Sequence, residues 1–404
     1  MHGRNNRSSA LALPADTRMT PPPPNKQASA TASALKAYEP SLDGMRGVCI
    51  AAVVLFHGCV RAGLVGWVRG GFIGVSVFFT LSGFLITSLL LRDNSEVGHV
   101  QLSQFWSRRI RRLWPAAYVV VAAVIALSTS GPLAARFSDV AAASWNVTNW
   151  HVIAGGDSQL LQTIVGPLGP TWSLAVEEQF YVVLALLLVG VLRLRRSTTW
   201  LTAAALVGVV VPVVLSNVAT DWQPSLEFNT ALRMPELFVG VLLAVWYRSG
   251  RWQLESAAVG DLLAGGGLAT LVGLFLLGDY SPAWLLRGGY TLVAFVTALT
   301  IIGLLRHGRV ATALSWMPLR TLGVVSYSLY LVHWPVMSVL TQDRTGLHGA
   351  TLLAVSLVVS IGLAWALHVF VERPVRRLKT EPLPTITAGL AGAAVLTLVS
   401  LVAL

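Results

Sequence analysis

The sequence predicts an all-α protein, a polytopic membrane helical bundle of about ten core transmembrane helices with one additional helix at the C-terminus. Three observations lead to this fold class. The 404 residues are 54% hydrophobic and only 12% charged, whereas soluble globular chains carry about 25% charged residues. The hydrophobic residues form separate segments of about 17–22 residues, the length that crosses about 30 Å of hydrocarbon. The segments lack the alternating polar and apolar residues of barrel strands, so helices are the structure that fits them.

Eleven segments have the length and hydropathy of membrane-spanning helices. They cover residues 46–62, 72–91, 113–129, 171–192, 199–215, 231–248, 258–277, 287–305, 321–340, 350–371 and 384–404. The residues before them contain Pro21–Pro24 and many Ser, Ala and Thr residues. This composition predicts a disordered cytoplasmic tail over residues 1–41, and the lack of an apolar core argues against a cleaved signal. We therefore expect a transmembrane domain over residues 42–379 and an additional transmembrane helix within 380–404.

The distribution of Lys and Arg predicts the orientation in the membrane. If the tail is cytoplasmic and every segment crosses once, 23 of the 29 basic residues fall on the cytoplasmic side. Cytoplasmic loops carry such an excess, so the N-terminus is expected in the cytoplasm and the C-terminus on the outer side. The net charge of +11 is then largely a topology signal. The basic residues are dispersed among apolar segments, so nucleic-acid binding is not expected.

Several common sites are missing from the sequence. Cys49 and Cys59 lie ten residues apart on the first apolar segment. This spacing is about 15 Å along a helix, too far for a disulfide. The sequence has no cluster of Cys and His at zinc spacing, no phosphate-binding P-loop and no GxSxG motif. We therefore expect no metal and no nucleotide-hydrolase or serine-hydrolase site.

Arg46 and His57 are placed where a membrane-spanning sequence normally has neither. They stand eleven residues apart, which is about three helical turns, so both project from nearly the same face about 16 Å apart. Ionisable groups inside a membrane usually mark a proton relay, an ion path or a catalytic site. The structural alternative is a polar contact between helices for His57 and an Arg46 side chain that reaches the interface.

A second group of charges is the arginine cluster that precedes the third apolar segment. Arg108, Arg111 and Arg112 share a helical face, with Arg109 beside them. Such a face can hold phosphate groups, although it can also be a positive-inside anchor. Asp43 stands just before Arg46, and the two could form a structural ion pair at the surface.

Carboxylates and a second histidine occur on later segments. Glu177 and Glu178 are adjacent on the fourth segment, so they point about 100° apart and can serve different partners, for example Arg233 or a substrate hydroxyl. Arg233 and Glu236 are three residues apart on the sixth segment, where an internal ion pair is the simplest interpretation. His333 lies deep in the ninth segment and shares a face with Tyr330.

Taken together and in this order, five groups of residues resemble the acyltransferase type 3 family of bacterial integral-membrane O-acyltransferases. They are the Arg46 and His57 spacing, Phe78-Phe79 with Ser82-Gly83-Phe84, the cluster Arg108–Arg112, the block Trp172–Tyr181 and the block Tyr327–Pro335. The resemblance implies ten core spans with a cytoplasmic N-terminus, and transfer of an acyl group, commonly acetyl from acetyl-CoA, to a hydroxyl. Acceptors in the family include cell-envelope polysaccharides, peptidoglycan, glycolipids and macrolides. Longer relatives carry an extra helix and then an exported SGNH-type domain; whether this chain continues into one stays open.

The chemistry of acyl transfer assigns roles to these residues. An alcohol is a poor nucleophile, so a base must take its proton, and a well-placed base gives about 10²–10⁴-fold in rate. A buried neutral His57 suits this role. Asp43, Arg46, Arg108, Arg109 and Arg112 are expected at a cytoplasmic mouth that holds the phosphates of acyl-CoA. The acceptor hydroxyl is expected to enter from the outer side near Glu177, Glu178 and His333.

The sequence therefore predicts an acyl-CoA-dependent O-acyltransferase of the bacterial inner membrane, acting on a hydroxyl-bearing glycan, glycolipid or macrolide. A secondary transporter or channel is the alternative, because charges at mid-depth and proline-interrupted helices fit that class too. The acceptor, the acyl chain length, the oligomeric state and a covalent acyl-histidine route are left open by the sequence.

Overall fold

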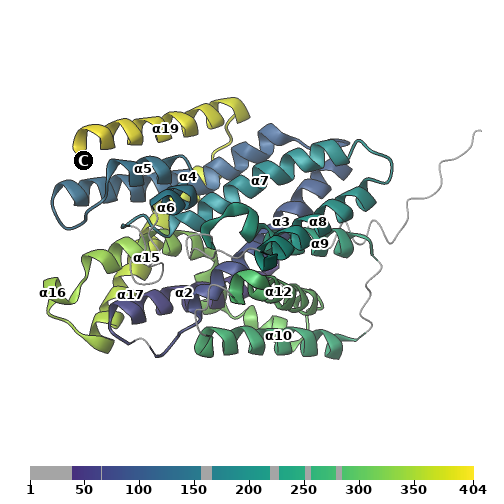
Figure 1. The fold of residues 1–404 in the computed structure, drawn as a ribbon, viewed down its shortest axis with the longest axis horizontal. Coiled ribbons are helices and arrows are strands. Elements are labelled where there is room, and N and C mark those ends of the chain that lie inside the picture. Colours follow the sequence, from purple (N-terminus) through teal and green to yellow (C-terminus); the bar gives the residue numbers. More distant parts are fainter. Residues whose placement is uncertain (1–38, 65, 156–165, 219–226, 251–255, 279–283) are drawn as a thin grey trace, which may run out of the picture.

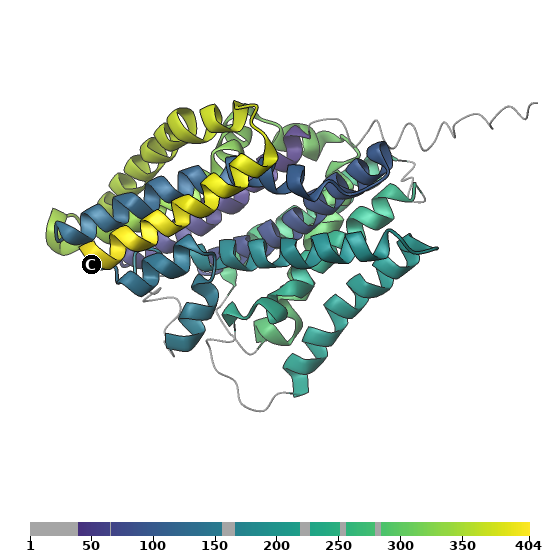
Figure 2. The same ribbon diagram turned by 90° about the horizontal axis from the view of Figure 1, so that it is seen from above.

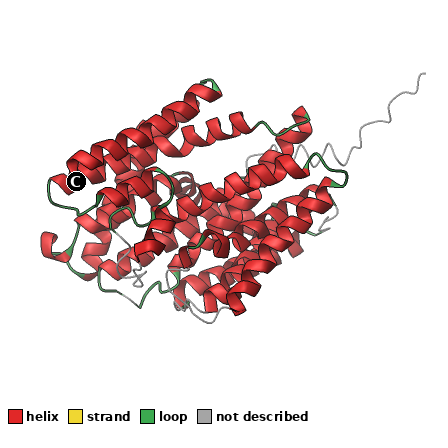
Figure 3. Cartoon of the chain, turned by 45° about the horizontal axis from the view of Figure 1, so that its top comes forward, coloured by secondary structure: helices red, strands yellow, loops and turns green. Residues whose placement is uncertain are grey.

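The computed structural model describes residues 39–404 apart from 65, 156–165, 219–226, 251–255 and 279–283. Within these residues every regular element is a helix (Figure 3). Of the expected tail, residues 1–38 lie outside the described part of the chain. Pro40 and Ser41, which we placed in that tail, instead form the first turn of the first long helix.

Ten helices in the described residues are long and apolar enough to cross a membrane, and a bent pair raises the number to eleven. The long helices are α2 Pro40–Arg61, α3 Gly74–Val97, α4 Leu102–Thr129, α7 Thr171–Val191, α8 Ser197–Val218, α9 Thr230–Arg248, α10 Ala257–Leu277, α12 Tyr290–Leu304, α17 Gly349–Leu367 and α19 Pro382–Ala403. Short helical turns extend three of them: η1 Gly71–Ile73 before α3, η3 Leu285–Gly289 before α12, and η4 His368–Glu372 with α18 Arg373–Arg377 after α17. The remaining short helices are α5 Phe137–Ser144, α6 Thr148–Gly155, α13 Arg309–Leu314 and α16 Gln342–Thr345. The predicted fold class, a polytopic helical bundle, is confirmed.

Two boundaries differ from the sequence expectation. Helix α4 begins at Leu102 rather than at 113, so the arginine cluster and the third apolar segment lie on one continuous helix. The expected span 321–340 is broken at Val325 into α14 Met317–Val324 and α15 Ser326–Val339, which are bent by 70°. Hydropathy locates the apolar part of a helix. It does not locate the residue where the helix begins or the point where it bends, which depend on the backbone and its contacts.

The helices that carry the candidate site form the centre of the bundle. Helix α2 is crossed by α14 and α15 and packs beside α3, which in turn lies along α9. In α9, 72% of the membrane-spanning window is buried, against 17% in α19. Figures 1 and 2 show α19 on the outside of the bundle, alongside α4 and α5. The sequence-predicted additional helix is therefore peripheral to the core.

Glycines bring the central helices into direct backbone contact. A side chain at Gly83 on α3 would overlap the backbone of Leu237, and one at Gly240 on α9 would overlap the backbone of Thr80. Small residues at such positions let membrane helices approach closely. The contact fixes α3 against α9, the pair of helices that carries Ser76 and Arg233.

Candidate active site

The side chains of His57 and His333 meet in the structure. His57 lies on α2 and His333 on α15, and His57 Nδ1 is 3.1 Å from His333 Nε2. His333 Nδ1 is 2.7 Å from the backbone carbonyl oxygen of Tyr330. Because a carbonyl only accepts, Nδ1 of His333 carries the proton, and Nε2 of the neutral ring accepts from His57 Nδ1. This assignment leaves Nε2 of a neutral His57 with its lone pair available to a substrate proton.

His57 is held in the protein interior rather than facing lipid. Its ring is 7% exposed and packs against the rings of Phe56, His333 and Trp334, each with a centroid separation of 5.2 Å. The ring lines a small space of about 40 Å³, which we call the inner chamber. The inner chamber is lined by His57, Phe72, Val75, Pro170, Trp172, Glu227, Phe228, Arg233, Tyr290 and Tyr330.

A much larger cavity of about 1190 Å³ opens at the arginine cluster, and we call it the cationic mouth. Its charged lining comprises nine cations, Arg46, Arg92, Arg108, Arg109, Arg111, Arg112, Arg376, Arg377 and Lys379, and four carboxylates, Asp43, Asp93, Glu372 and Glu381. The sequence analysis named Asp43 and four of these cations for phosphate binding. It did not assign the basic residues that follow η4 to this site, because their approach to α4 depends on the tertiary fold.

Three of the expected mouth residues are partly held by neighbours. Arg46 Nη1 is 3.4 Å from Asp43 Oδ1, and Arg46 Nη2 donates to Ser326 Oγ at 3.2 Å. Arg108 Nη2 donates to Asp93 Oδ2 at 2.7 Å. Asp43 thus orients Arg46 toward the cavity, which is the ion pair that the sequence offered as an alternative. An ion pair at the rim leaves further guanidinium hydrogens for a ligand.

A middle cavity of about 120 Å³ lies between the cationic mouth and the inner chamber. It shares Arg46, Ile86, Arg109, Arg112 and Tyr327 with the mouth, and Val75 and Tyr330 with the inner chamber. Tyr330 is therefore the partition on the way to His57. Its hydroxyl donates to the Pro170 carbonyl at 2.9 Å and lies 2.6 Å from Ser173 Oγ.

Glu177 lines the middle cavity, and Glu178 is the next residue on α7. Arg109 Nε donates to Glu178 Oε1 at 2.8 Å, and Arg109 Nη2 is 3.7 Å from Glu177 Oε2. Ser82 Oγ donates to Glu177 Oε1 at 2.7 Å, and the guanidinium lies over the Tyr181 ring at 3.6 Å. The suggested partner Arg233 is therefore wrong. Arg109 reaches both carboxylates from α4, which already runs as a helix from Leu102.

Arg233 is the centre of a second buried charge cluster, which reaches the inner chamber. Its Nε and Nη2 donate to Glu236 at 2.8 and 3.0 Å, as the sequence spacing suggested, and Nη2 also donates to Ser76 Oγ at 3.2 Å. Its Nη1 lies 3.6 Å from Glu227 Oε1, and the hydroxyl of Tyr290 also donates to this carboxylate. The sequence analysis missed Glu227 and Tyr290. Glu227 falls between two apolar segments and belongs to no recognisable motif.

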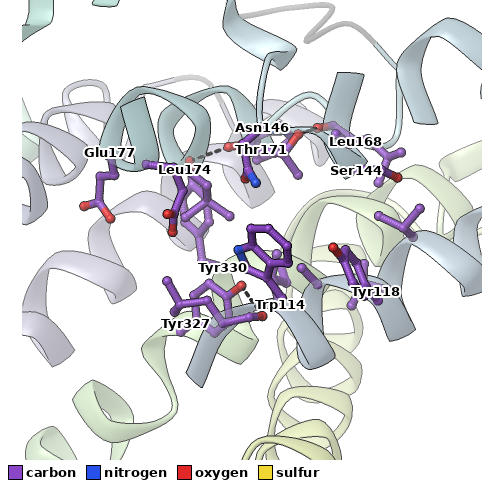
Figure 4. Close-up of a pocket in the computed structure, with 18 of the residues that line it drawn as sticks. Trp114, Tyr118, Ser144, Asn146, Leu168, Thr171, Leu174, Glu177, Tyr327 and Tyr330 are labelled. Atoms are coloured by element: carbon purple, nitrogen blue, oxygen red, sulfur yellow. Dashed lines mark hydrogen bonds between the residues drawn. The ribbon is translucent and has the colours of Figure 1, made fainter. Parts of the chain in front are cut away.

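A side cavity of about 30 Å³ branches from the middle cavity between α4, α5, α7 and α15. Figure 4 shows Trp114, Tyr118 and Ser144 among the residues that line it, together with Glu177 and Tyr330. The indole Nε1 of Trp114 and Oγ of Ser144 are buried with no hydrogen-bond partner among the described residues. The cavity has room for about one or two water molecules, so it is too small for a donor or a sugar.

Comparison with known proteins identifies the group to which this architecture belongs. A family model described as an acyltransferase domain matches residues 39–369. The chain belongs to the acyltransferase type 3 family. The resemblance drawn from five groups of residues is thereby confirmed, and those groups lie on helices that line the cationic mouth, the middle cavity and the inner chamber.

Curated relatives of this acyltransferase carry O-acetyltransferase names. O-acetyltransferase OatA of Staphylococcus aureus (strain NCTC 8325 / PS 47) is 30% identical over 356 residues, covering 84% of this chain and 57% of the relative. YrhL of Bacillus subtilis (strain 168), provisionally named a peptidoglycan O-acetyltransferase, is 33% identical over 358 residues, covering 84% and 55%. The chain thus spans little more than half the length of these relatives. No solved structure matches the chain. In the described residues, no group of three or more His, Cys, Asp or Glu side chains is arranged to hold a metal ion.

Proposed function

We propose that this acyltransferase is a multi-pass O-acyltransferase of the bacterial cell membrane. It moves an acyl group, acetyl in the first instance, from cytoplasmic acyl-CoA to a hydroxyl of a cell-envelope glycan, glycolipid or macrolide-type glycoside. The observation that carries the proposal is the His57 and His333 pair at the end of the cavities that begin at the cationic mouth. The names of the relatives favour acetyl as the transferred group.

The cationic mouth suits the nucleotide part of CoA. Its nine cations outnumber its four carboxylates, and guanidinium groups bind phosphates through charge-assisted hydrogen bonds. Arg109 is already compensated by two carboxylates, so we assign the phosphates to Arg46, Arg108 and Arg112 together with the basic residues after η4. The thin pantetheine arm would follow the middle cavity and bring the thioester toward Tyr330.

Transfer then needs one proton acceptor. His57 Nε2 takes the proton of the acceptor hydroxyl as its oxygen attacks the thioester carbonyl carbon, whose π electrons move to the carbonyl oxygen. Collapse of this intermediate re-forms the carbonyl and breaks the carbon–sulfur bond, and the leaving thiolate receives the proton from His57. His333 accepts the hydrogen bond of His57 Nδ1 and so stabilises the imidazolium that forms in between. We assign Glu177 and Glu178 to positioning Arg109 at the middle cavity.

The direction of transfer is supported by the charge bias of the sequence. Every cation that lines the mouth belongs to the basic residues assigned to the cytoplasmic side, whereas Arg233 in the inner chamber belongs to the smaller outer set. A donor from the cytoplasm and an acceptor from outside would therefore meet at His57. We accordingly propose a cytoplasmic N-terminus and an outer C-terminal end of α19.

The test is transfer of labelled acetyl from acetyl-CoA by the protein in proteoliposomes, with His57→Ala as the variant. We expect transfer to fall by about 10²–10⁴-fold, the contribution of a general base, while CoA still raises the unfolding temperature of the purified variant. His348→Ala is the matched control, since His348 is exposed and lines none of the three cavities. Parental transfer by His57→Ala at equal expression would overturn the assignment. Mass spectrometry of lipid and glycan extracts from strains with and without the gene then identifies the acceptor.

A further inference from the structure

An apolar groove lies on the surface of the bundle between α4, α15 and α17, apart from the cavities of the candidate active site. Its volume is about 480 Å³, within the range of about 300–1,000 Å³ that is usual for ligand pockets. Every side chain that lines it is apolar, from residues 119–127, 332–340 and 359–371. Val119, Leu363 and Phe370 of this lining are exposed, so the groove is open to the surroundings of the protein.

The helices around the groove have the length and hydropathy of membrane spans, so the surroundings are hydrocarbon rather than water. An unfilled hollow would deprive its lining of packing partners. The hollow lies behind a weak wall, because α15 is short, is bent by 70° from α14 and contains Pro335, which lines the groove. Proline has no N–H to donate to the Leu331 carbonyl. An alkyl chain in the groove would therefore pack against the helix that carries His333.

One end of the groove carries a cation, Arg344. Its Nη1 is 3.4 Å from the backbone carbonyl oxygens of Ser338 and Val339, and it also donates to the carbonyl of Pro132. Val339 itself lines the groove, so these contacts hold the guanidinium at its rim. Its hydrogen bonds in the described part of the chain all go to neutral carbonyls and all involve Nη1. Arg344 is exposed, and Nε and Nη2 can donate to an anionic ligand.

We propose that the groove and Arg344 together bind one anionic phospholipid of the surrounding bilayer. An alkyl chain lies in the groove against α15, and the phosphate accepts hydrogen bonds from Nε and Nη2 of Arg344. The apolar lining selects a hydrocarbon chain, and the cation at the rim selects a negative headgroup. Arg344 belongs to the basic residues assigned to the outer side, so the lipid comes from the outer leaflet. This lipid site does not depend on the proposed acyl transfer.

Native mass spectrometry of the full chain in detergent tests the groove. The protein is titrated with dioleoylphosphatidylglycerol, which is anionic, or with dioleoylphosphatidylcholine, which has the same chains and no net charge. We expect the parent to retain one phosphatidylglycerol molecule in preference to phosphatidylcholine. Ala123→Trp places an indole in the groove, because Ala123 is exposed and lines it, and should remove the bound lipid of either kind. Ala122→Trp is the matched control, since Ala122 is the next exposed residue and does not line the groove.

Arg344→Gln tests the headgroup contact at the rim. It should weaken phosphatidylglycerol binding about fivefold, the contribution of one cation near an anionic lipid, and leave phosphatidylcholine binding unchanged. Arg136→Gln, at another exposed arginine of the outer set that does not line the groove, should change neither. The parental elution volume and helical circular dichroism spectrum show that each variant is folded. Parental lipid retention by Ala123→Trp, including a case where this variant only turns a dimer into a monomer, would overturn the site. An unchanged lipid preference of Arg344→Gln would overturn it too.

Discussion

His57 Nδ1 and His333 Nε2 lie 3.1 Å apart, although the two residues are 276 positions apart in the chain. The second imidazole is itself fixed by the Tyr330 carbonyl, 2.7 Å from His333 Nδ1. His57 therefore donates a hydrogen bond to His333, and His333 donates one to the backbone carbonyl. These two bonds select one tautomer for each ring. A base oriented by a second group is the arrangement that nucleophile activation requires.

Replacing His333 tests whether these hydrogen bonds orient His57 for catalysis. We expect His333→Leu to lower kcat for acetyl transfer about 10–100-fold, the usual effect of removing a group that orients a functional histidine. CoA protection should persist, because His333 lines neither the mouth nor the middle cavity. His333→Gln should recover part of the loss, since the amide oxygen can accept from His57 Nδ1. His348→Leu serves as the control. Equal kcat for the Leu and Gln variants would contradict the orienting role.

The cationic mouth predicts a defect confined to the donor. Arg112 is exposed and lines both the mouth and the middle cavity. Arg112→Ala should raise KM for acetyl-CoA about tenfold through loss of a charge-assisted hydrogen bond and leave kcat nearly unchanged. KM for S-acetyl-pantetheine, which lacks the nucleotide phosphates, should not move. Arg195→Ala, an exposed arginine between α7 and α8 that lines none of these cavities, is the control. A parallel rise for S-acetyl-pantetheine would show that Arg112 does not read phosphates.

Arg109 forms a buried charge cluster with Glu177 and Glu178. Replacing Arg109 is therefore expected to lower the stability of the protein rather than its affinity for the donor. Arg109→Met leaves Glu177 and Glu178 uncompensated, and breaking a buried ion pair in this way costs about 3–5 kcal/mol. Thermal unfolding in detergent measures the effect. Adding Glu177→Gln and Glu178→Gln should restore most of the lost unfolding temperature. Arg111→Met is the matched control, because Arg111 is on the same helix and bonds Thr380 at the surface. A single variant as stable as the parent would show that the carboxylates find other partners.

The sequence predicts the charged and titratable residues of the site that lie within apolar segments. Arg46, His57 and His333 stand out because charge or titratable chemistry is rare within an apolar segment. Their order along the chain also carried the family resemblance. The helices were predictable for the same reason, since each apolar segment must cross the hydrocarbon as a helix.

Contacts between helices that are far apart in the sequence could not be predicted from residue spacing. Sequence spacing suggested Arg233 as a partner for Glu177 and Glu178, and only the tertiary fold shows that Arg109 of α4 reaches both carboxylates. Glu227 lies just before α9, where carboxylates are ordinary, and only the fold brings it to the chamber that His57 also lines. The bend at Val325 was hidden because the residues on both sides are apolar enough to pass as one span.

The contact between α3 and α9 places Ser76 within hydrogen-bond distance of Arg233, and a substitution of Gly240 tests this contact. A Cβ at Gly240 would overlap the Thr80 carbonyl oxygen and press on the backbone of Gly83 and Phe84. Gly240→Ala should therefore lower stability by about 1–3 kcal/mol, the range for overpacking a tight contact. Gly266→Ala on α10, where nothing lies within 4 Å, should leave stability equal or raise it by about 0.5–1 kcal/mol, because alanine favours a helix over glycine. Unfolding temperatures of the two variants in the same detergent give the comparison. If they shift in the same direction, α3 and α9 can separate without penalty, and the glycine contact does not hold Ser76 against Arg233.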